Sequence, residues 1–486
     1  MVQEKWGELV WSRDHDRTTL SRAAKRGTLR RIVPGLYTAA TDRDLANVVR
    51  RNLIPILAHE LPGAVIADRS AHAGGLPIEG ELFVVHGRDR ALTLPGLTIV
   101  PRPGPGALER DVPLPGGVSI ASEARTMLDS LRRPGGRRLT RAEIEAWIDQ
   151  LAASGGARRL NSVRDLGRQI APTLHAEAAF ETLSALIAAS LQTGPADQVT
   201  TARLAARSAG DAYDARRVSL FERLVGRLVE RSPGGILDFP ADADRRATLP
   251  FFEAYFSNFI EGTEFTLAEA ERIVFRGEVP DDRPDDAHDI IGTYGIVADR
   301  SRRGIVPANS TEFLELLRQL HSEVMAARSE KRPGDFKHVD NRAGSTEFVS
   351  PDLVTGTLRR AFDLGDALLN PFQRATYMMF VVSEVHPFLD GNGRIARIAM
   401  NAELTAGGCV RIIVPTVLRL NYVAALKAAT VHRSFDALTA VLEFAQRYTA
   451  RVDFSTLQSA EQVLTATNAL RDPYEAEQAG VRLQLP

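Results

Sequence analysis

Residues 386–401 hold the side chains of this sequence that are best suited to chemistry on a phosphate. His386 precedes a DGNG turn, and Arg394 and Arg397 follow it. An imidazole that is neutral near pH 7 can accept a proton. Two glycines allow backbone N–H groups of the turn to converge on an anion. Arg394, Arg397 and Asn401 recur at helical spacings of three and four, so they share one face that could clamp a polyphosphate.

Two helices must position this turn. Asn370 and Pro371 suit the cap and the first position of a helix, whose apolar residues recur every three or four positions. That helix should end at Pro387, because proline cannot continue it, and this leaves the histidine just before the turn. A second helix should run from about Gly393 until a glycine pair stops it. The sequence therefore predicts a helix, a loop and a helix, with an anion site at the positive end of the second helix.

The string HPFLDGNGRIAR, from His386 to Arg397, resembles the signature of the Fic family, HxFx[D/E]GNGRxxR, at every specified position. The resemblance implies a bacterial-type protein adenylyltransferase, which transfers AMP from ATP, with Mg²⁺, to a hydroxyl of a target protein or of itself. It leaves open the transfer of another nucleotide or of a phosphocholine-like group, and the removal of AMP.

The resemblance also implies a role for each residue of the signature. His386 would be the general base, Phe388 would anchor the loop in the core, and Asp390 would hold Mg²⁺. Arg394 would engage the leaving phosphates and Arg397 the γ-phosphate. The nucleotide-binding residues so implied are Gly391, Asn392, Gly393, Arg394 and Arg397. Asn401 has two interpretations: it contacts the nucleotide, or it completes a local hydrogen-bond network.

Upstream of the signature, Glu261 is expected at the C-terminus of an aromatic-rich helix that Gly262 stops. A carboxylate there opposes the helix dipole, by about 0.3–1 kcal/mol when exposed, and is more favourable beside a cation. The string SNFIEG, from Ser257 to Gly262, resembles the Fic inhibitory motif [S/T]xxxE[G/N]. The resemblance implies that Glu261 pairs with Arg397, occupies the γ-phosphate site and inhibits the protein from within. The alternative is an ordinary helix end.

Residues 336–351 resemble the flap of the Fic family. Ala343, Gly344 and Ser345 suit the tip of a hairpin. The exposed edge of such a hairpin, near residues 340–349, could hold an extended segment of a target protein by strand addition. The alternative is a surface hairpin without a partner.

The clearest basic segment is residues 17–31, which contain six basic side chains and no acidic one. A short helix followed by a basic hairpin suits a winged helix. The string GTLRRIVPGLY resembles the N-terminal region of AbiE-type antitoxins and regulators, over about residues 1–135. The side chains that could contact DNA are Arg22, Lys25, Arg26, Arg30 and Arg31. A solvated basic face weighs equally against DNA binding.

The composition of the chain limits the number of domains and the kinds of partner that we expect. The 486 residues are 44% hydrophobic, which suggests two to four domains. Charge is balanced, with 60 basic and 61 acidic residues, so any basic surface must be local. Cys409 is the single cysteine, which excludes an internal disulfide framework. The sequence shows neither a signal peptide nor an apolar stretch of about 18 residues, so we expect a cytoplasmic protein without membrane contact.

The predicted fold is mainly α: an all-α Fic-fold helical bundle with a β-hairpin flap, preceded by a winged helix and a small α/β domain. The expected parts are a winged-helix-like domain (1–60), an AbiE-type regulator-like α/β domain (61–135), a helical connecting region (136–232), a Fic domain with its inhibitory helix (233–455) and a C-terminal tail (456–486).

Besides the adenylyltransferase, a second hypothesis is a DNA-binding transcriptional regulator or toxin–antitoxin fusion, in which the Fic half senses nucleotides. The sequence also leaves a homo-oligomer open.

Overall fold

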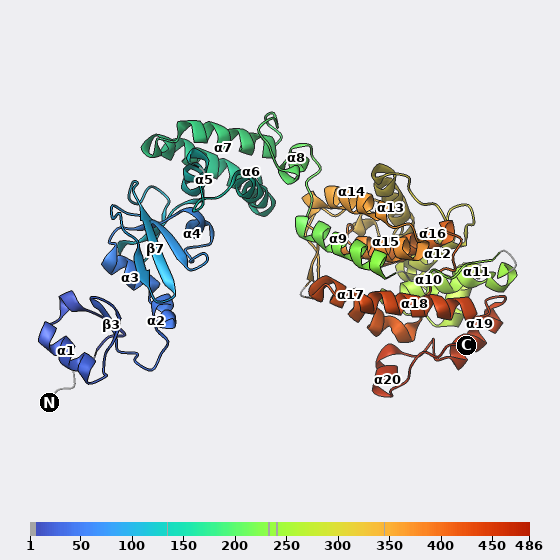
Figure 1. The fold of residues 1–486 in the computed structure, drawn as a ribbon. Coiled ribbons are helices and arrows are strands. Elements are labelled where there is room, and N and C mark those ends of the chain that lie inside the picture. Colours follow the sequence, from blue (N-terminus) through green and yellow to red (C-terminus); the bar gives the residue numbers. More distant parts are fainter. Residues whose placement is uncertain (1–5, 134, 232–233, 240–241, 345) are drawn as a thin grey trace. The chain divides into compact units, whose positions relative to one another are not determined.

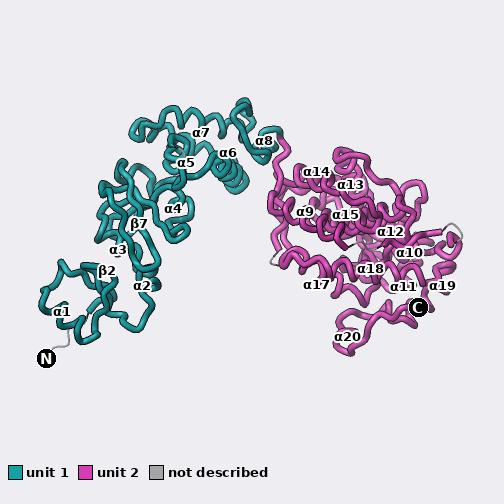
Figure 2. Tube along the Cα trace, in the orientation of Figure 1, with its two compact units in different colours: residues 1–209 teal, residues 210–486 magenta. Residues whose placement is uncertain are grey.

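The computed structural model describes residues 6–133, 135–231, 234–239, 242–344 and 346–486. The chain divides into two compact units, residues 1–209 and 210–486 (Figure 2). The fold is mainly α, as predicted, with β-structure concentrated in the first unit (Figure 1). Among the described residues, no helix has the length and apolarity needed to cross a bilayer.

The first unit begins with a three-stranded antiparallel sheet in the order β1-β3-β2. Its elements are β1 (Leu9–Trp11), α1 (Arg17–Lys25), β2 (Arg30–Val33) and β3 (Leu36–Thr38). Asp16 caps α1 by accepting from the Thr19 backbone N–H at 2.8 Å. Gly35, with φ 92°, provides the turn between β2 and β3. The helix and hairpin expected in this segment are therefore both present, while its assignment as a winged helix stays a prediction.

A six-stranded mixed sheet follows, in the order β6-β7-β5-β4-β9-β8. Its strands are β4 (Val65–Ile66), β5 (Glu81–Val85), β6 (Leu92–Leu94), β7 (Leu97–Arg102), β8 (Val112–Pro113) and β9 (Ser119–Ile120). The accompanying helices are α2 (Leu45–Arg51), α3 (Leu53–Glu60), α4 (Asp68–His72) and α5 (Glu123–Arg132). Arg102 Nη2 donates to Asp68 Oδ1 at 2.9 Å and to Asp129 Oδ2 at 2.7 Å, which ties β7 to α4 and α5. Residues 61–135 therefore contain both strands and helices, and α2 and α3, from the segment predicted as part of 1–60, share a core with this sheet.

The first unit ends in helices α6 (Arg141–Leu174), α7 (Glu177–Ser190) and α8 (Ala202–Ser208). A capping box of Thr140 and Glu143 begins α6. The long α6 contains one non-helical residue, Gly156 at φ 58°. Leu183 and Leu186 of α7 are fully buried in a core that these helices share with Met127 and Leu128 of α5.

The second unit is a helical bundle with one two-stranded hairpin. Its elements are α9 (Ala215–Glu230), α10 (Leu249–Ile260), α11 (Leu267–Arg276), α12 (Pro284–Ala298), α13 (Ser310–Val324), β10 (Arg342–Ala343), β11 (Thr346–Glu347), α14 (Val354–Leu364), α15 (Pro371–Val385), α16 (Asn392–Ala406), α17 (Arg419–His432), α18 (Asp436–Arg451), α19 (Leu457–Ala466) and α20 (Pro473–Gln478).

The boundary of this unit differs from the one predicted between residues 232 and 233. Helix α9 packs on α14 and α15 (Figure 1). The ring of Phe221 on α9 lies edge-on to that of Phe380 on α15, with centroids 6.2 Å apart. The helical pattern of α9 continues that of the preceding helices, so only tertiary packing shows that it belongs to the second unit.

The segment predicted as a separate tail, residues 456–486, is part of the second unit. Leu464 of α19 and Ala469 are fully buried, in one core with Phe252 of α10. The polar sequence of α19 did not predict this packing, because a short helix needs few apolar residues to cover one face of a core.

Candidate active site

Helices α15 and α16 hold the loop that the sequence singled out. Asn370 caps α15 by accepting from the Phe372 N–H at 2.9 Å. Helix α15 ends at Val385, and His386 adopts the left-handed conformation at φ 52° and ψ 60°. Gly391, at φ 72°, precedes the first residue of α16. The predicted helix, loop and helix are therefore present, with α16 beginning at Asn392.

Phe388 anchors the loop, and a second histidine supports it. The Phe388 side chain is fully buried, and its ring stacks on that of His321 with centroids 3.8 Å apart. The Gly334 N–H donates to His321 Nδ1 at 2.9 Å, so the ring proton is on Nε2, which donates to the Asp390 carbonyl at 3.2 Å. Burial lowers the pKa of His321 to about 4. A neutral imidazole thus fixes the backbone at Asp390.

The side chain of Asn392 closes the loop on itself. Its Oδ1 accepts from the Phe388 N–H at 2.8 Å, and its Nδ2 donates to the Phe388 carbonyl at 3.0 Å. The side chain of Asn392 is therefore used inside the loop. Only its backbone is left to bind an anion.

His386 has the protonation state that a general base needs. Its Nδ1 lies 3.3 Å from the Ser383 carbonyl, which can only accept, so Nδ1 carries the proton and Nε2 is the basic nitrogen. The Phe348 ring stacks on the imidazole, with centroids 3.8 Å apart and planes 5° from parallel. Burial lowers the pKa of His386 to about 4, and the charge of Lys337 adds to this effect. The imidazole is therefore neutral at pH 7.

Arg397 and Glu261 form the ion pair that the sequence predicted. Arg397 Nη2 donates to Glu261 Oε1 at 2.8 Å and to the Ser257 carbonyl at 2.7 Å. Arg397 Nε donates to Ser257 Oγ at 3.0 Å. Glu261 follows the last residue of α10, and Gly262 at φ 95° turns the chain away. The arginine thereby offsets the unfavourable position of a carboxylate at a helix C-terminus.

The Glu261 carboxylate also covers the start of α16. A Cβ atom added to Gly393 would lie 2.7 Å from Glu261 Cδ, so only glycine admits this approach. Gly393 is the second residue of α16, where unpaired N–H groups and the helix dipole favour negative charge. Glu261 therefore places its carboxylate at a position that favours negative charge.

Arg394 is placed differently from Arg397. Its Nη1 contacts Asp289 Oδ2 and donates to Asn258 Oδ1 at 3.3 Å. Arg328 Nε donates to the same Asp289 oxygen at 3.0 Å. Arg394 is 3% exposed, so its charge requires this carboxylate. Asp289 and Asn258 gave no signal in the sequence, because each lies more than 100 residues from Arg394 and belongs to another helix.

Asn401 follows the second of the two interpretations. Its Nδ2 donates to Glu253 Oε1 at 2.8 Å and to the Ile412 carbonyl at 2.9 Å. Its Oδ1 accepts from the Ile412 N–H at 2.7 Å. The side chain is 2% exposed. In this conformation Asn401 therefore completes a local hydrogen-bond network, and its contact with a nucleotide stays a prediction.

The carboxylate of Asp390 could hold a magnesium ion. Its Oδ1 accepts from the Gly391 N–H at 2.7 Å, and Oδ2 has no hydrogen bond to any residue that the structure describes. Within the same residues, no three His, Cys, Asp or Glu side chains are grouped to hold a metal. Mg²⁺ in phosphate-binding sites commonly takes one or two carboxylates, the phosphates and several waters. A single free carboxylate oxygen beside an anion site matches that donor set.

The hairpin β10–β11 forms the expected flap, with Arg342 paired to Glu347; Ser345 lies outside the described residues. Lys337 and Asn341 attach the flap to the loop. Lys337 Nζ donates to Asn341 Oδ1 at 2.6 Å, and Asn341 Nδ2 donates to the Phe388 carbonyl at 2.9 Å. Burial lowers the pKa of Lys337 to about 8.

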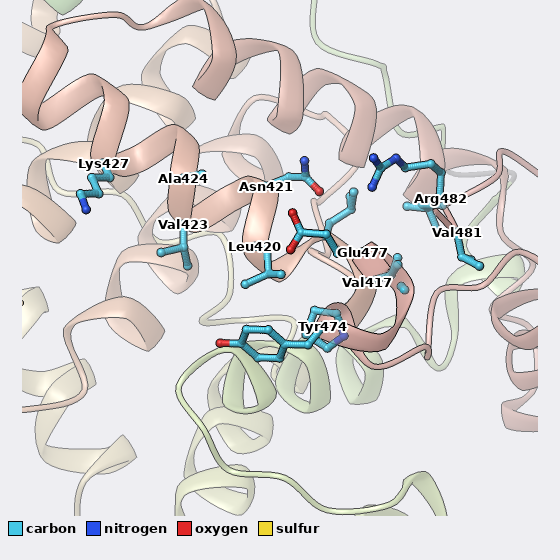
Figure 3. Close-up of a pocket in the computed structure, with 14 residues that line it drawn as sticks. Val417, Leu420, Asn421, Val423, Ala424, Lys427, Tyr474, Glu477, Val481 and Arg482 are labelled. Carbon is cyan, nitrogen blue, oxygen red and sulfur yellow. The ribbon is translucent and has the colours of Figure 1, made fainter. Parts of the chain in front are cut away.

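One pocket, with a volume of about 350 Å³, lies beside the catalytic loop. Its lining includes Glu261, His386, Gly393, Arg397, the flap residue Thr346 and Tyr422 of α17. Val423 and Lys427 of α17 also line a neighbouring groove that α20 borders (Figure 3). In Figure 3, Tyr474 and Glu477 of α20 lie across this groove from Leu420. The pocket therefore opens between the flap and α17.

In the first unit, the five side chains considered for DNA contact are all exposed: Arg22, Lys25, Arg26, Arg30 and Arg31. Lys25 and Arg31 line a hollow of about 620 Å³ together with Arg17 and Tyr37. The basic segment therefore lies on the surface of the first unit.

Comparison with known proteins agrees with the geometry of the second unit. Residues 311–404 match the model of the Fic/DOC family. It is similar to the protein adenylyltransferase fic-1 of Caenorhabditis elegans, with 23% identity over 232 residues, 47% of this chain and 46% of that protein. It is also similar to the protein adenylyltransferase Fic of Drosophila persimilis, with 27% identity over 187 residues, 36% of each chain.

The chain thus spans less than half the length of these relatives. A solved structure of a Fic domain containing signaling protein from Bacteroides thetaiotaomicron aligns with a TM-score of 0.40 and 18% identity, over 50% of this chain and 97% of that chain.

Proposed function

We propose that this chain is a protein adenylyltransferase, which transfers AMP from ATP to a hydroxyl of a target protein or of itself, and which Glu261 inhibits. One observation carries the proposal: a neutral His386, the start of α16 and Arg397 line a single pocket, and a carboxylate of the same chain occupies its anion position. The printed names of the two relatives, both protein adenylyltransferases, support the reaction.

The proton transfer follows from the tautomer of His386. With Nδ1–H held by the Ser383 carbonyl, Nε2 accepts the proton of the target hydroxyl. The hydroxyl oxygen forms a bond to the α-phosphorus of ATP, and the bond from that phosphorus to the bridging oxygen breaks. Pyrophosphate leaves with the electron pair. Catalysis then depends mainly on position and charge.

The groups that meet the phosphates come from α16 and the loop. The N–H groups at the start of α16 would bind phosphate oxygens, and Arg397 would meet the terminal phosphate once Glu261 releases it. Asp390 would hold Mg²⁺, which would supply positive charge to stabilise the leaving group. Arg394 would orient this end of α16 through its contact with Asp289, and its contact with the leaving phosphates stays a prediction.

Inhibition follows from competition for one position. Arg397 cannot hold Glu261 Oε1 at 2.8 Å and a γ-phosphate oxygen in the same geometry. ATP that binds while Glu261 is present must therefore place its phosphates elsewhere, away from in-line attack. Movement of Glu261 away from Arg397 would relieve the inhibition.

The target would be held by the flap. The short strands β10 and β11 border the pocket, and Phe348, next to β11, packs on His386. A segment of the target added to the flap edge would present one hydroxyl to the imidazole.

A panel of labelled nucleotides tests the reaction and the donor together. The Glu261→Gly protein, given ATP, GTP, CTP or UTP labelled on the α-phosphate, with Mg²⁺ and a lysate, should label protein most strongly from ATP. The His386→Ala form of that variant should bind ATP and label nothing. Stronger labelling from another nucleotide would show that ATP is not the donor. Release of AMP from labelled protein would indicate that the enzyme removes AMP.

A second function for the first unit rests on its exposed basic segment. We propose that Arg22, Lys25, Arg26, Arg30 and Arg31 contact DNA phosphates. A gel shift of the gene's own promoter should weaken steeply with salt, and replacement of Arg30 and Arg31 by alanine should abolish it. A shift that is insensitive to both changes would contradict this role.

A further inference from the structure

A second pocket lies at the far end of α10 and α16 from the catalytic loop. It has a volume of about 360 Å³, and its lining includes Leu249 and Pro250 at the start of α10, and Thr405 near the end of α16. Four arginines also line it: Arg246, Arg300, Arg303 and Arg411. None of these residues lines the catalytic pocket.

The charges of this second pocket are unbalanced. Arg411 contacts Glu253, and Arg246 contacts Asp238, with Asp242 at 3.9 Å. The guanidinium groups of Arg300 and Arg303 have neither a hydrogen bond nor an ion pair with the residues that the structure describes.

Burial, together with the charges of Arg411 and Arg300, lowers the pKa of Arg303. Guanidinium groups nevertheless keep their charge in proteins. The pocket therefore holds positive charge that an anion would stabilise.

The position of the pocket adds to this preference. Leu249 and Pro250, the first two residues of the twelve-residue helix α10, line the pocket, and the dipole at a helix N-terminus favours negative charge. Phe239 and Tyr294 add aromatic surface to the lining. We propose that this second pocket binds a phosphate-bearing small molecule, and that binding strengthens inhibition by Glu261.

Helix α10 links the two pockets. Its Glu253 contacts both Arg411 in the second pocket and Asn401 of α16, and its C-terminal end carries Ser257 and Glu261 to Arg397. The second pocket is formed while Glu261 holds Arg397. A ligand that binds this conformation favours it over one in which α10 has moved. The regulatory part of the inference rests on the proposed function; the binding part does not.

Calorimetry with inorganic pyrophosphate on the full chain tests the binding. Wild type should bind at the second pocket, and the Arg300→Ala/Arg303→Ala protein should bind there at least about tenfold more weakly, because two charge-assisted contacts are lost. Arg276→Ala, which removes an exposed arginine outside both pockets, is the matched control. Equal binding by wild type and the double variant, or no binding by wild type, would overturn the site.

Self-labelling from ATP tests the regulation. Pyrophosphate also competes directly at the catalytic pocket, but equally in wild type and in the Arg300→Ala/Arg303→Ala protein. When pyrophosphate is added, the labelling of wild type should therefore fall by a factor about fivefold larger than that of the double variant. In the Glu261→Gly background this difference should vanish. Equal loss would overturn the regulatory role, whereas absence of labelling in every variant would contradict the proposed function and leave the calorimetric result valid.

Discussion

Arg397 of α16 and Glu261 at the end of α10 are joined by a hydrogen bond of 2.8 Å, although 136 residues separate them in the chain. The side chain of Arg397 is 6% exposed and that of Glu261 26%, so the guanidinium is buried while the carboxylate is partly open to water. Ser257 holds the same guanidinium through its hydroxyl and its carbonyl. A buried arginine that lost the carboxylate would need another anion, and a substrate phosphate meets that need. Under the proposed function, the contact with Glu261 and the contact with a substrate phosphate are thus alternatives at one cation.

The pH dependence of labelling should reflect the pKa of His386, which burial lowers to about 4. A general base must be neutral, so activity should be constant from about pH 5 through neutrality and fall only as the pH drops through about 4. The measurement is the rate of labelling by the Glu261→Gly protein across this range, on samples shown to be folded at each pH. An acidic limb centred near pH 6.5 would show that the imidazole is solvated during turnover.

Replacement of His321 by alanine should slow labelling and destabilise the second unit. The variant loses the stack on Phe388, the bond to the Asp390 carbonyl and the bond from Gly334, which together are worth about 2–5 kcal/mol. Thermal unfolding and labelling rates measure both effects. His288→Ala, which removes an exposed histidine, is the control and should change neither. An unchanged rate in the His321 variant would mean that the loop holds its geometry without this ring.

The stability of the second unit should fall as the pH drops from 6.5 toward 4. The folded protein holds His321 neutral with its pKa lowered to about 4, whereas the unfolded chain protonates near 6.5. The stabilisation is therefore complete above pH 6.5 and is lost through this window, by roughly 3 kcal/mol at most from this residue. Urea unfolding at several pH values measures the loss of stability between pH 6.5 and 4. This loss should be smaller in His321→Phe than in wild type. Parallel pH profiles would contradict it.

Replacement of Asp289 by asparagine should cost about 3–5 kcal/mol, because it leaves the buried charge of Arg394 and the charge of Arg328 without their shared carboxylate. Chemical denaturation of the variant measures this cost. Asp281→Asn, at an exposed position, is the matched control and should have a midpoint like that of wild type. Equal midpoints for the two variants would show that Asp289 does not balance these charges.

Local signals in the sequence predicted the elements that position the site. Asn370 marks the start of α15, and Gly262 follows the end of α10, because caps and positive-φ glycines act on their immediate neighbours. Motif resemblance led to the pairing of Glu261 with Arg397. The supports of the loop could not be predicted in this way. His321 lies 69 residues from Asp390 and Asp289 lies 105 residues from Arg394, and no periodicity encodes contacts over such distances.

Helical spacing also has a limit as a guide to a site. Arg394, Arg397 and Asn401 share one face by spacing, yet only Arg397 lines the pocket. Asp289 holds Arg394, and Glu253 and the Ile412 backbone hold Asn401. Buried polar groups must be paired, and the neighbouring helices decide which partner each finds.

The most direct test of the central claim compares self-labelling from ATP by wild type and Glu261→Gly, with Glu264→Gly as a control at a neighbouring exposed glutamate. Loss of a charge-assisted contact worth about 1.5–3 kcal/mol should raise labelling by about tenfold or more in Glu261→Gly and leave the control at the wild-type level. Equal labelling by all three proteins, each folded and able to bind ATP, would contradict the account.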